Sequence, residues 1–358
     1  MPARSRALAA AVALPLLLTG CVAEGGPSDV DPLLGDEACQ ANRDAGPITF
    51  LTSFGYAASV GILDVLAADE LGYFDQLCLD VTLEPGSANT QLVSAGTAQF
   101  AGIGGASDVL VARDNGAELE AAAVYGNQGA IELLTMADSG IDAIGDFAGT
   151  TIGYKEVIPP QFQAMLQGNG VDLDSIEWVS VGYAPSILPD GQVDALAAYK
   201  SNEPLALRAA GHDIVEWDPD DYGVPSTFNA QVVNTAFAEE HPAAVADFLR
   251  ASLHAYDWIN ADGANLDEAL GWAEARSEAG YDVEVSRARW QREVELVDES
   301  LPEGWPVGWM DEAQWRPEAE VLARYDLIAA EPDLAAAFDT SFLESVTDSG
   351  TIRWPEEG

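Results

Sequence analysis

The stretch QFAGIGGASDVLVARDNGAELEAAAVYG, residues 99–126, decides the fold. It contains a short apolar run, a stretch with the composition of a helix that ends at Gly116, and a second apolar run rich in alanine and valine. Two apolar runs on either side of a helix are typical of a strand–helix–strand unit with a right-handed crossover. The stretch therefore predicts strands at 99–105 and 119–126 and a helix at 106–116.

The same alternation continues on both sides of this unit and predicts an α/β protein with mainly parallel sheets. The further expected strands are PITFLTSF (47–54), LDVTLEPG (79–86), AIELLTM (130–136), TTIGYKEV (150–157), IEWVSVGY (176–183), VDALAAYK (193–200), DIVEWDP (213–219) and STFNAQVVN (226–234). The further expected helices are GILDVLAADELGYF (61–74), which Gly72 ends, NTQLVSAGTA (89–98), with Asn89 as its N-cap, PPQFQAMLQGNG (159–170), EPLALRAAG (203–211) and HPAAVADFLRASLHAYDWI (241–259), with Pro242 in its first turn.

Two α/β units followed by helices predict two lobes. The first lobe is expected to consist of residues 47–128 and 229–358, and the second of residues 129–228. The chain would cross between them near 127–129 and again near 228–230. Ligands of open α/β sheets bind beyond the carboxyl ends of the strands, so we expect a ligand between the lobes and closure by a hinge motion.

The first 20 residues have the composition of an export signal. Arg4 and Arg6 precede the apolar run ALAAAVALPLLL (7–18), which is shorter than the roughly 20 residues that a membrane-spanning helix needs. The residues Leu18-Thr19-Gly20-Cys21 resemble the lipobox of bacterial lipoproteins, which implies a mature chain that begins at a lipid-modified Cys21. An ordinary secretory signal is the alternative. Residues 21–46 are expected to form a flexible tether.

The cysteines fit this interpretation. If lipid occupies Cys21, then Cys39 and Cys78 are an even pair in an oxidising compartment, where a disulfide between them is expected. Two separate buried thiols are the alternative. The chain has no C-x-x-C motif, and its three histidines lack the spacing of metal ligands, so we expect no metal and no cofactor.

The charge of the chain excludes two classes of partner. Its net charge is −45, and loss of Arg4 and Arg6 with the leader takes it to −47. Such a surface repels nucleic acid and anionic lipid headgroups. The hydrophobic content of 48% is high enough for a folded core.

Six segments in fixed order resemble the substrate-binding proteins of ABC importers, and more narrowly the group that includes nitrate, sulfonate and taurine receptors and NMT1/THI5-like thiamine-pyrimidine receptors. The segments are ADELGYFDQLCLDVTLEPG (68–86), QLVSAGTAQFAGIGG (91–105), ARDNGAELEAAAVYG (112–126), DSGIDAIGDFAGTTIGY (138–154), DGQVDALAAYKSNEP (190–204) and DDYGVPSTFNAQVVN (220–234). One departure is Cys78, where the family usually has a small residue, often glycine.

The resemblance implies a fold and a function. The fold is periplasmic-binding-protein-like type II, and the function is that of a monomeric receptor on the outer face of the cytoplasmic membrane, which delivers a small nutrient to an ABC permease. The segments SNEP (201–204) and DDYGVP (220–225) favour a thiamine-type aminopyrimidine, with riboflavin-like heterocycles next. A nitrate, sulfonate or taurine receptor is the alternative.

Candidate ligand contacts are the loops at the carboxyl ends of the predicted strands. The residues from the first lobe are Phe54, Tyr56, Ser87, Asn89, Thr90, Gly104, Gly105 and Tyr125. The residues from the second lobe are Tyr154, Lys155, Tyr183, Tyr199, Asn202 and Glu203.

The second-lobe residues suit a flat heterocycle with an amino group. Aromatic rings can sandwich the heterocycle, and Glu203 can accept hydrogen bonds from its amine. A helix-dipole role for Glu203, as an acid in a first helical turn, is equally open. Lys155 and Lys200, the two lysines of the chain, both follow predicted strands. They either bind an acceptor or anionic group of the ligand, which would favour the oxyanion alternative, or are ion-pair residues. The turn at 102–107 is either a tight strand-to-helix turn or a source of free N–H groups for a ligand.

An enzymatic function is disfavoured. The sequence has no G-x-S-x-G motif and no evident arrangement of a nucleophile with a histidine. One class within the resembled family is a pyrimidine-forming enzyme with a cysteine-rich motif. This chain has no such cluster and carries an export leader, so we expect a binding protein.

Overall fold

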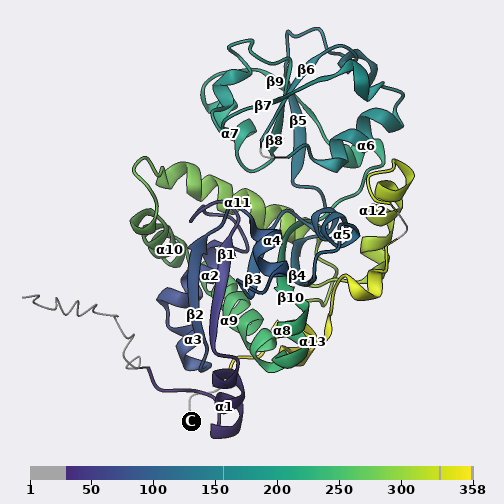
Figure 1. Cartoon of the computed structure of the whole chain (residues 1–358). Coiled ribbons are helices and arrows are strands. Elements are labelled where there is room, and N and C mark those ends of the chain that lie inside the picture. Colours follow the sequence, from purple (N-terminus) through teal and green to yellow (C-terminus); the bar gives the residue numbers. More distant parts are fainter. Residues whose placement is uncertain (1–29, 156, 330–331, 356–358) are drawn as a thin grey trace, which may run out of the picture.

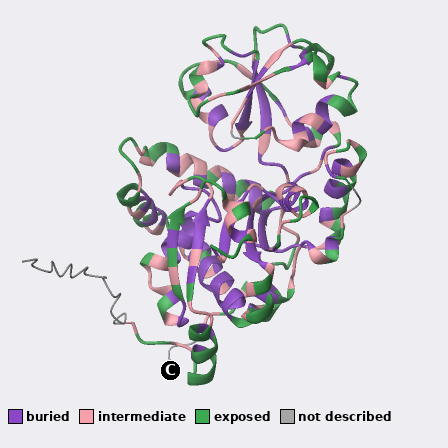
Figure 2. Cartoon of the chain, in the orientation of Figure 1, coloured by how far each residue is buried: buried purple, intermediate pink, exposed green. Residues whose placement is uncertain are grey.

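The computed structural model describes residues 30–155, 157–329 and 332–355, which form two α/β lobes (Figure 1). The predicted leader and Cys21 lie outside the described residues. Each lobe is built on one five-stranded sheet. Buried residues line the strands of both sheets, and exposed residues cover the outer faces of the helices (Figure 2). Within the described residues, none of the helices combines the length and the apolar character needed to cross a membrane.

The sheet of lobe 1 has the strand order β2-β1-β3-β10-β4. Strand β1 is parallel to β2 and β3, whereas β10 is antiparallel to both of its neighbours. The strands are β1 (Pro47–Thr52), β2 (Asp80–Pro85), β3 (Phe100–Ile103), β4 (Leu119–Gly126) and β10 (Phe228–Asn234).

The sheet of lobe 2 repeats this arrangement in the order β7-β6-β8-β5-β9. Strand β6 is parallel to β7 and β8, whereas β5 is antiparallel to β8 and β9. The strands are β5 (Ile131–Met136), β6 (Thr151–Tyr154), β7 (Glu177–Ser180), β8 (Ala195–Tyr199) and β9 (Ile214–Trp217). The antiparallel strand of each sheet is the first one that the chain forms after it arrives from the other lobe.

The chain crosses between the sheets at residues 127–130 and 218–227. The first crossing was expected near 127–129. The second comes earlier than the expected 228–230, because those residues already pair with β3 and β4 as part of β10. The 3-10 turn η4 (Pro219–Tyr222) lies within this second crossing.

Helices cover both faces of the lobe 1 sheet, and one aromatic stack marks the core on one face. Phe248 of α9 stacks on Phe50, Phe74 and Phe100, with ring centroids 5.7, 5.2 and 4.1 Å apart. All four rings are buried. The helices are α2 (Leu63–Glu70), α3 (Tyr73–Gln76), α4 (Asn89–Ser94), α5 (Ala106–Asp114), α8 (Thr235–Glu240), α9 (Pro242–Ala261), α10 (Gly263–Arg276), α11 (Val283–Ser300) and α13 (Ser341–Val346).

Lobe 2 has fewer helices, and one helix from the C-terminal part of the chain contacts both lobes. In α12 (Glu312–Arg324), Trp315 packs in a core cluster of lobe 1, whereas Val321 packs in the core of lobe 2. Residues after 229 therefore do not belong to lobe 1 alone. The remaining elements are α6 (Pro160–Gly168), α7 (Glu203–Ala209), η1 (Ile144–Phe147), η2 (Leu173–Ser175), η3 (Pro185–Ile187), η5 (Leu334–Ala336), β11 (Thr347–Asp348) and β12 (Thr351–Ile352).

The structure corrects the expectation of a tether as far as residue 46. Helix α1 (Asp36–Asp44) is held to lobe 1 by a disulfide between Cys39 and Cys78, whose Cα atoms are 5.3 Å apart. The Asn42 amide adds hydrogen bonds to the Leu77 carbonyl at 2.8 Å and to the Asp247 carboxylate at 2.6 Å. Composition could not reveal these contacts, because the partners lie 35 and 205 residues away.

Candidate functional site

The lobe 2 sheet brings predicted ligand residues together. Strands β7, β6 and β8 are neighbours, and the loops after them carry Tyr183, Lys155 and the segment 199–203. Lys155 forms an ion pair with Glu203, and its Nζ lies 5.9 Å from the centroid of the Tyr183 ring. The Tyr183 side chain is exposed, so an aromatic face and a charge pair lie side by side at one edge of lobe 2.

Glu203 is the most constrained residue of this group. It is the first residue of α7 and is fully buried. Its carboxylate accepts hydrogen bonds from the Tyr199 backbone N–H at 2.8 Å and from the Asn202 side-chain amide at 2.9 Å, besides the Lys155 ammonium. A buried carboxylate needs such partners to remain charged. Glu203 is thus held in a fixed orientation by its own loop and by Lys155, which follows β6.

An aromatic contact joins lobe 1 to this group. The rings of Phe54 and Tyr199 meet edge to face with centroids 5.6 Å apart. Phe54 follows β1 and is 37% exposed. Tyr56 lies nearby in sequence, but its hydroxyl donates to the Leu83 carbonyl at 3.2 Å. The Phe54–Tyr199 pair therefore connects the carboxyl ends of strands from the two lobes.

No contact joins three other predicted residues to this group within the described part of the chain. Ser87 is exposed and Thr90 is half-buried, both in the segment that follows β2. Tyr154 contacts Trp178, with the ring centroids 6.5 Å apart.

Two further predicted residues make hydrogen bonds within lobe 1. Tyr125 is fully buried, donates its hydroxyl proton to Asp64, and accepts a hydrogen bond from Gln231 at 3.1 Å. Asn89 is not an N-cap, because Ala88 occupies that position of α4. Its side-chain amide instead donates to backbone carbonyls near the carboxyl ends of β1 and β3, at 2.9 to 3.4 Å. These acceptors are Leu51, Thr52 and Gly102.

The turn that contains Gly104 and Gly105 is closed by the protein itself. The N–H of Ala106 donates to the Thr227 hydroxyl at 2.7 Å, and the N–H of Ser107 donates to the Glu318 carboxylate at 2.8 Å. The Thr227 hydroxyl donates to the same carboxylate at 3.2 Å. These two N–H groups are therefore not free for a ligand, which favours the interpretation as a tight strand-to-helix turn.

Sequence reasoning missed Glu318, which stands 211 residues after Ser107 on α12. Burial raises the pKa of the Glu318 carboxyl to about 7, although the hydrogen bonds from Ser107 and Thr227 oppose the shift. The only sequence signal is that Glu318 stands among the apolar positions of the buried face of α12.

The second lysine holds the first crossing. Lys200 donates to the Gly129 carbonyl at 2.7 Å and pairs with Asp218, which favours its ion-pair interpretation.

Trp217 is buried, donates to the Thr135 hydroxyl at 3.0 Å and stacks with Tyr222. Both aromatic residues therefore pack within lobe 2.

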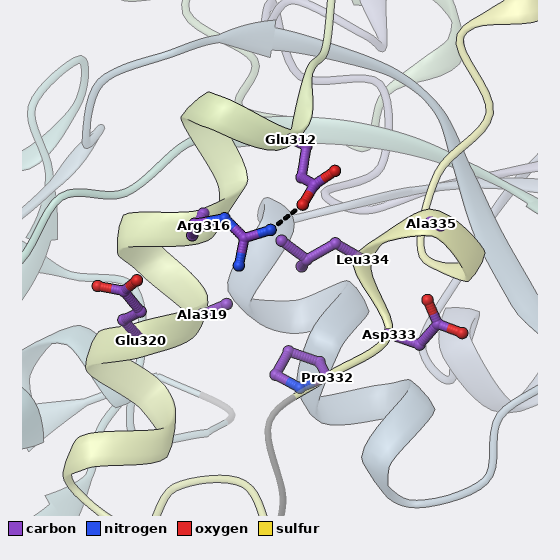
Figure 3. A pocket seen from close by; sticks show the side chains of 8 residues that line it. All are labelled: Glu312, Arg316, Ala319, Glu320, Pro332, Asp333, Leu334 and Ala335. Carbon is purple, nitrogen blue, oxygen red and sulfur yellow. Dashed lines mark hydrogen bonds and ion pairs between the residues drawn. The ribbon is translucent and has the colours of Figure 1, made fainter.

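Two cavities lie away from this group. One, of about 230 Å³, lies between α12 and η5, where Arg316 pairs with Glu312 (Figure 3). The other, of about 270 Å³, lies beside Trp305 and Trp309. Neither cavity includes a predicted ligand residue. Within the described residues, no group of three or more His, Cys, Asp or Glu side chains could hold a metal ion.

Comparison with known sequences identifies relatives of this chain. The family described as NMT1/THI5 like matches residues 60–265, more than half of the chain. The formylaminopyrimidine-binding protein of Halalkalibacterium halodurans is 28% identical over 268 residues, which cover 72% of this chain and 80% of that protein.

Comparison with solved structures shows the fold. The periplasmic aliphatic sulphonate binding protein SsuA of Escherichia coli is 14% identical, with a TM-score of 0.61 and coverage of 87% of this chain and 94% of that one. The desulfurization enzyme DSZB is 15% identical, with a TM-score of 0.52 and coverage of 83% and 98%. The likeness to the binding protein confirms the periplasmic-binding-protein-like fold. Because receptors and an enzyme share this fold, the fold alone does not assign the function.

Proposed function

The chain belongs to the NMT1/THI5-like family, and from this premise we propose that it is the solute receptor of an ABC importer. It binds a small nutrient between its two lobes and delivers it, as a monomer, to a membrane permease. The aromatic contact between Phe54 and Tyr199 supports this role, because it joins the ligand loops of the two lobes.

The proposed ligand is a thiamine-type aminopyrimidine. The observation that carries this proposal is the buried Glu203 carboxylate, which accepts from the Tyr199 N–H and pairs with Lys155, whose ammonium lies near the Tyr183 ring. A carboxylate held in place can accept hydrogen bonds from an exocyclic amine, while aromatic rings stack on the flat pyrimidine. The relative in Halalkalibacterium halodurans, named for formylaminopyrimidine binding, supports the same class of ligand.

The pairing of the charged side chains disfavours the alternative of an oxyanion receptor. A nitrate or sulfonate receptor needs a cation that the ligand can neutralise. Lys200 is already neutralised by Asp218, and Lys155 pairs with the same Glu203 carboxylate that is proposed to face the amine. The net charge of −45 also opposes an anionic ligand. A pyrimidine-forming enzyme is weaker still, since the curated relative is named a binding protein.

We also propose that the receptor is an exported lipoprotein anchored through Cys21. The disulfide between Cys39 and Cys78 supports export, because disulfides persist in oxidising compartments. The chain is joined to lobe 1 close to this pair, where the Leu33 N–H donates to the Gln76 carbonyl at 2.9 Å. The segment between Cys21 and α1 is long enough to connect a lipid to the folded body, and the acidic body itself need not contact the membrane.

The variant Glu203→Gln tests the ligand class. A lost hydrogen bond between an amine and a carboxylate should raise the Kd for an aminopyrimidine by about 10- to 100-fold. Glu177→Gln, an exposed glutamate at the start of β7, is the matched control and should leave the Kd unchanged. Isothermal titration calorimetry measures both, with circular dichroism to verify folding. An unchanged Kd in folded Glu203→Gln would show that this carboxylate does not contact the ligand.

A further inference from the structure

Helix α11 lies on lobe 1 at the side that faces lobe 2 (Figure 1). Trp290, Leu296 and Val297 are fully buried in the core of lobe 1, and the Trp290 indole donates to Asn260 of α9 at 3.0 Å. These contacts make α11 a rigid part of lobe 1. Two of its polar residues, Arg289 and Glu293, point to other partners.

The Glu293 carboxylate is buried and accepts four hydrogen bonds. One oxygen accepts from the Ser59 hydroxyl at 2.6 Å, from the Val60 N–H at 2.9 Å and from the Asn229 amide at 3.3 Å. The other oxygen accepts from the Ser201 hydroxyl at 2.8 Å. All four donors are uncharged. Burial raises the pKa of the Glu293 carboxyl, and the hydrogen bonds together with the nearby Arg289 guanidinium oppose this shift.

These donors come from both lobes. Ser59 and Val60 belong to lobe 1, Asn229 stands at the start of β10 just after the second crossing, and Ser201 belongs to lobe 2. Asn229 has a φ of +52°, a left-handed conformation that non-glycine residues seldom adopt. Such a conformation persists where surrounding contacts hold it, and the bond to Glu293 is one of them.

A second contact reaches the ligand group itself. Arg289, one helical turn before Glu293, donates to the side-chain oxygen of Asn202. The amide of Asn202 in turn donates to Glu203 at 2.9 Å. Ser201 and Asn202 immediately precede Glu203 and follow Tyr199, so α11 contacts the middle of the loop that carries the proposed ligand residues.

We propose that Glu293 is a positioning residue that holds the 199–203 loop of lobe 2 against lobe 1, so that a carboxylate which does not itself contact the ligand determines the affinity. Arg289 assists through Asn202. The consequence for affinity rests on the proposed function. Loss of the Ser201 bond would let the loop leave its binding geometry. The apparent Kd would then rise as the fraction of molecules with the loop in this geometry falls.

Two serine variants separate this role from a general effect on stability. Ser201→Ala and Ser59→Ala each remove one hydroxyl bond to the same carboxylate, at similar distances, but only the first bond joins the lobes. We expect amide exchange in residues 199–203 of the ligand-free Ser201→Ala protein to accelerate about tenfold. The Kd for an aminopyrimidine should also rise about tenfold. Ser59→Ala should change neither value by more than about twofold, while both variants lose thermal stability alike.

The glutamate itself offers a second pair of variants. Glu293→Gln should reproduce the faster exchange at 199–203, whereas Glu295→Gln, exposed two positions later on the same helix, should not. Equal acceleration in Ser201→Ala and Ser59→Ala, or none in Ser201→Ala, would overturn the positioning role. Failure of the wild-type protein to bind an aminopyrimidine would overturn the proposed function instead, because the exchange measurement needs no ligand.

Discussion

Removal of the disulfide between Cys39 and Cys78 should destabilise lobe 1 by an amount that depends on the residue placed at position 78. The bond joins residues 39 positions apart, and a cross-link over a loop of this length stabilises by about 4 kcal/mol through the entropy of the unfolded chain. Both cysteines are buried in the fold, so the bond belongs to the packed body and not to the tether.

The backbone at Cys78 works against this gain. Its φ is +59°, in the left-handed region, which costs a non-glycine residue about 1–2 kcal/mol. Glycine, which the resembled family often has at this position, adopts this conformation without that cost. The variant Cys39→Ser/Cys78→Gly should therefore recover about 1 kcal/mol of the stability that Cys39→Ser/Cys78→Ser loses.

Urea unfolding followed by circular dichroism measures both differences. We expect the serine pair to lose about 4 kcal/mol relative to the oxidised wild type and the glycine variant about 3 kcal/mol. Reduced wild type serves as the control and should resemble the serine pair. A glycine variant no more stable than the serine pair would refute the left-handed strain at position 78, and a loss below about 1 kcal/mol in both would refute the entropic argument.

Two further predictions concern a buried acid and the leader. Because burial raises the pKa of Glu318 from 4.5 to about 7, the folded state binds a proton more tightly than the unfolded state between these values, so stability should fall as the pH rises from about 4.5 to about 7. Glu318→Gln, which keeps the side chain neutral, should flatten the stability–pH curve in this window; an identical slope in urea unfolding at several pH values would contradict the shift. Metabolic labelling with a radioactive fatty acid in a bacterial host should mark the wild-type protein and not Cys21→Ser, whereas equal labelling of both would exclude Cys21 as the anchor.

The fold was largely predictable because its signals are local. Apolar runs such as 119–126 and 193–200 became β4 and β8, and Gly72 and Gly116 adopt positive φ where helices α2 and α5 were expected to end. The antiparallel direction of β10 was harder to predict, since the sequence of residues 228–234 resembles that of any other buried strand. Their direction follows from the route of the chain between the lobes.

The candidate site was predicted in part for the same reason. Lys155 and Glu203 stand at the ends of recognisable strands, but their ion pair joins residues 48 positions apart. Asn89 and Tyr125 also follow or end strands, yet they pack into lobe 1. Distant neighbours such as Asp64 determine which loop residues turn outward, and no local sequence pattern predicts these neighbours. The same applies to Glu293 and Glu318, whose partners come from distant segments.

Direct calorimetry on the wild-type protein tests the central claim, that the chain is a receptor for an aminopyrimidine nutrient. Formylaminopyrimidine should bind at one site per chain, with a negative heat-capacity change from burial of the ring. An alkanesulfonate and nitrate should release no heat of binding at the same concentrations. Binding of the alkanesulfonate without binding of formylaminopyrimidine would contradict the account and would assign the chain to the oxyanion receptors.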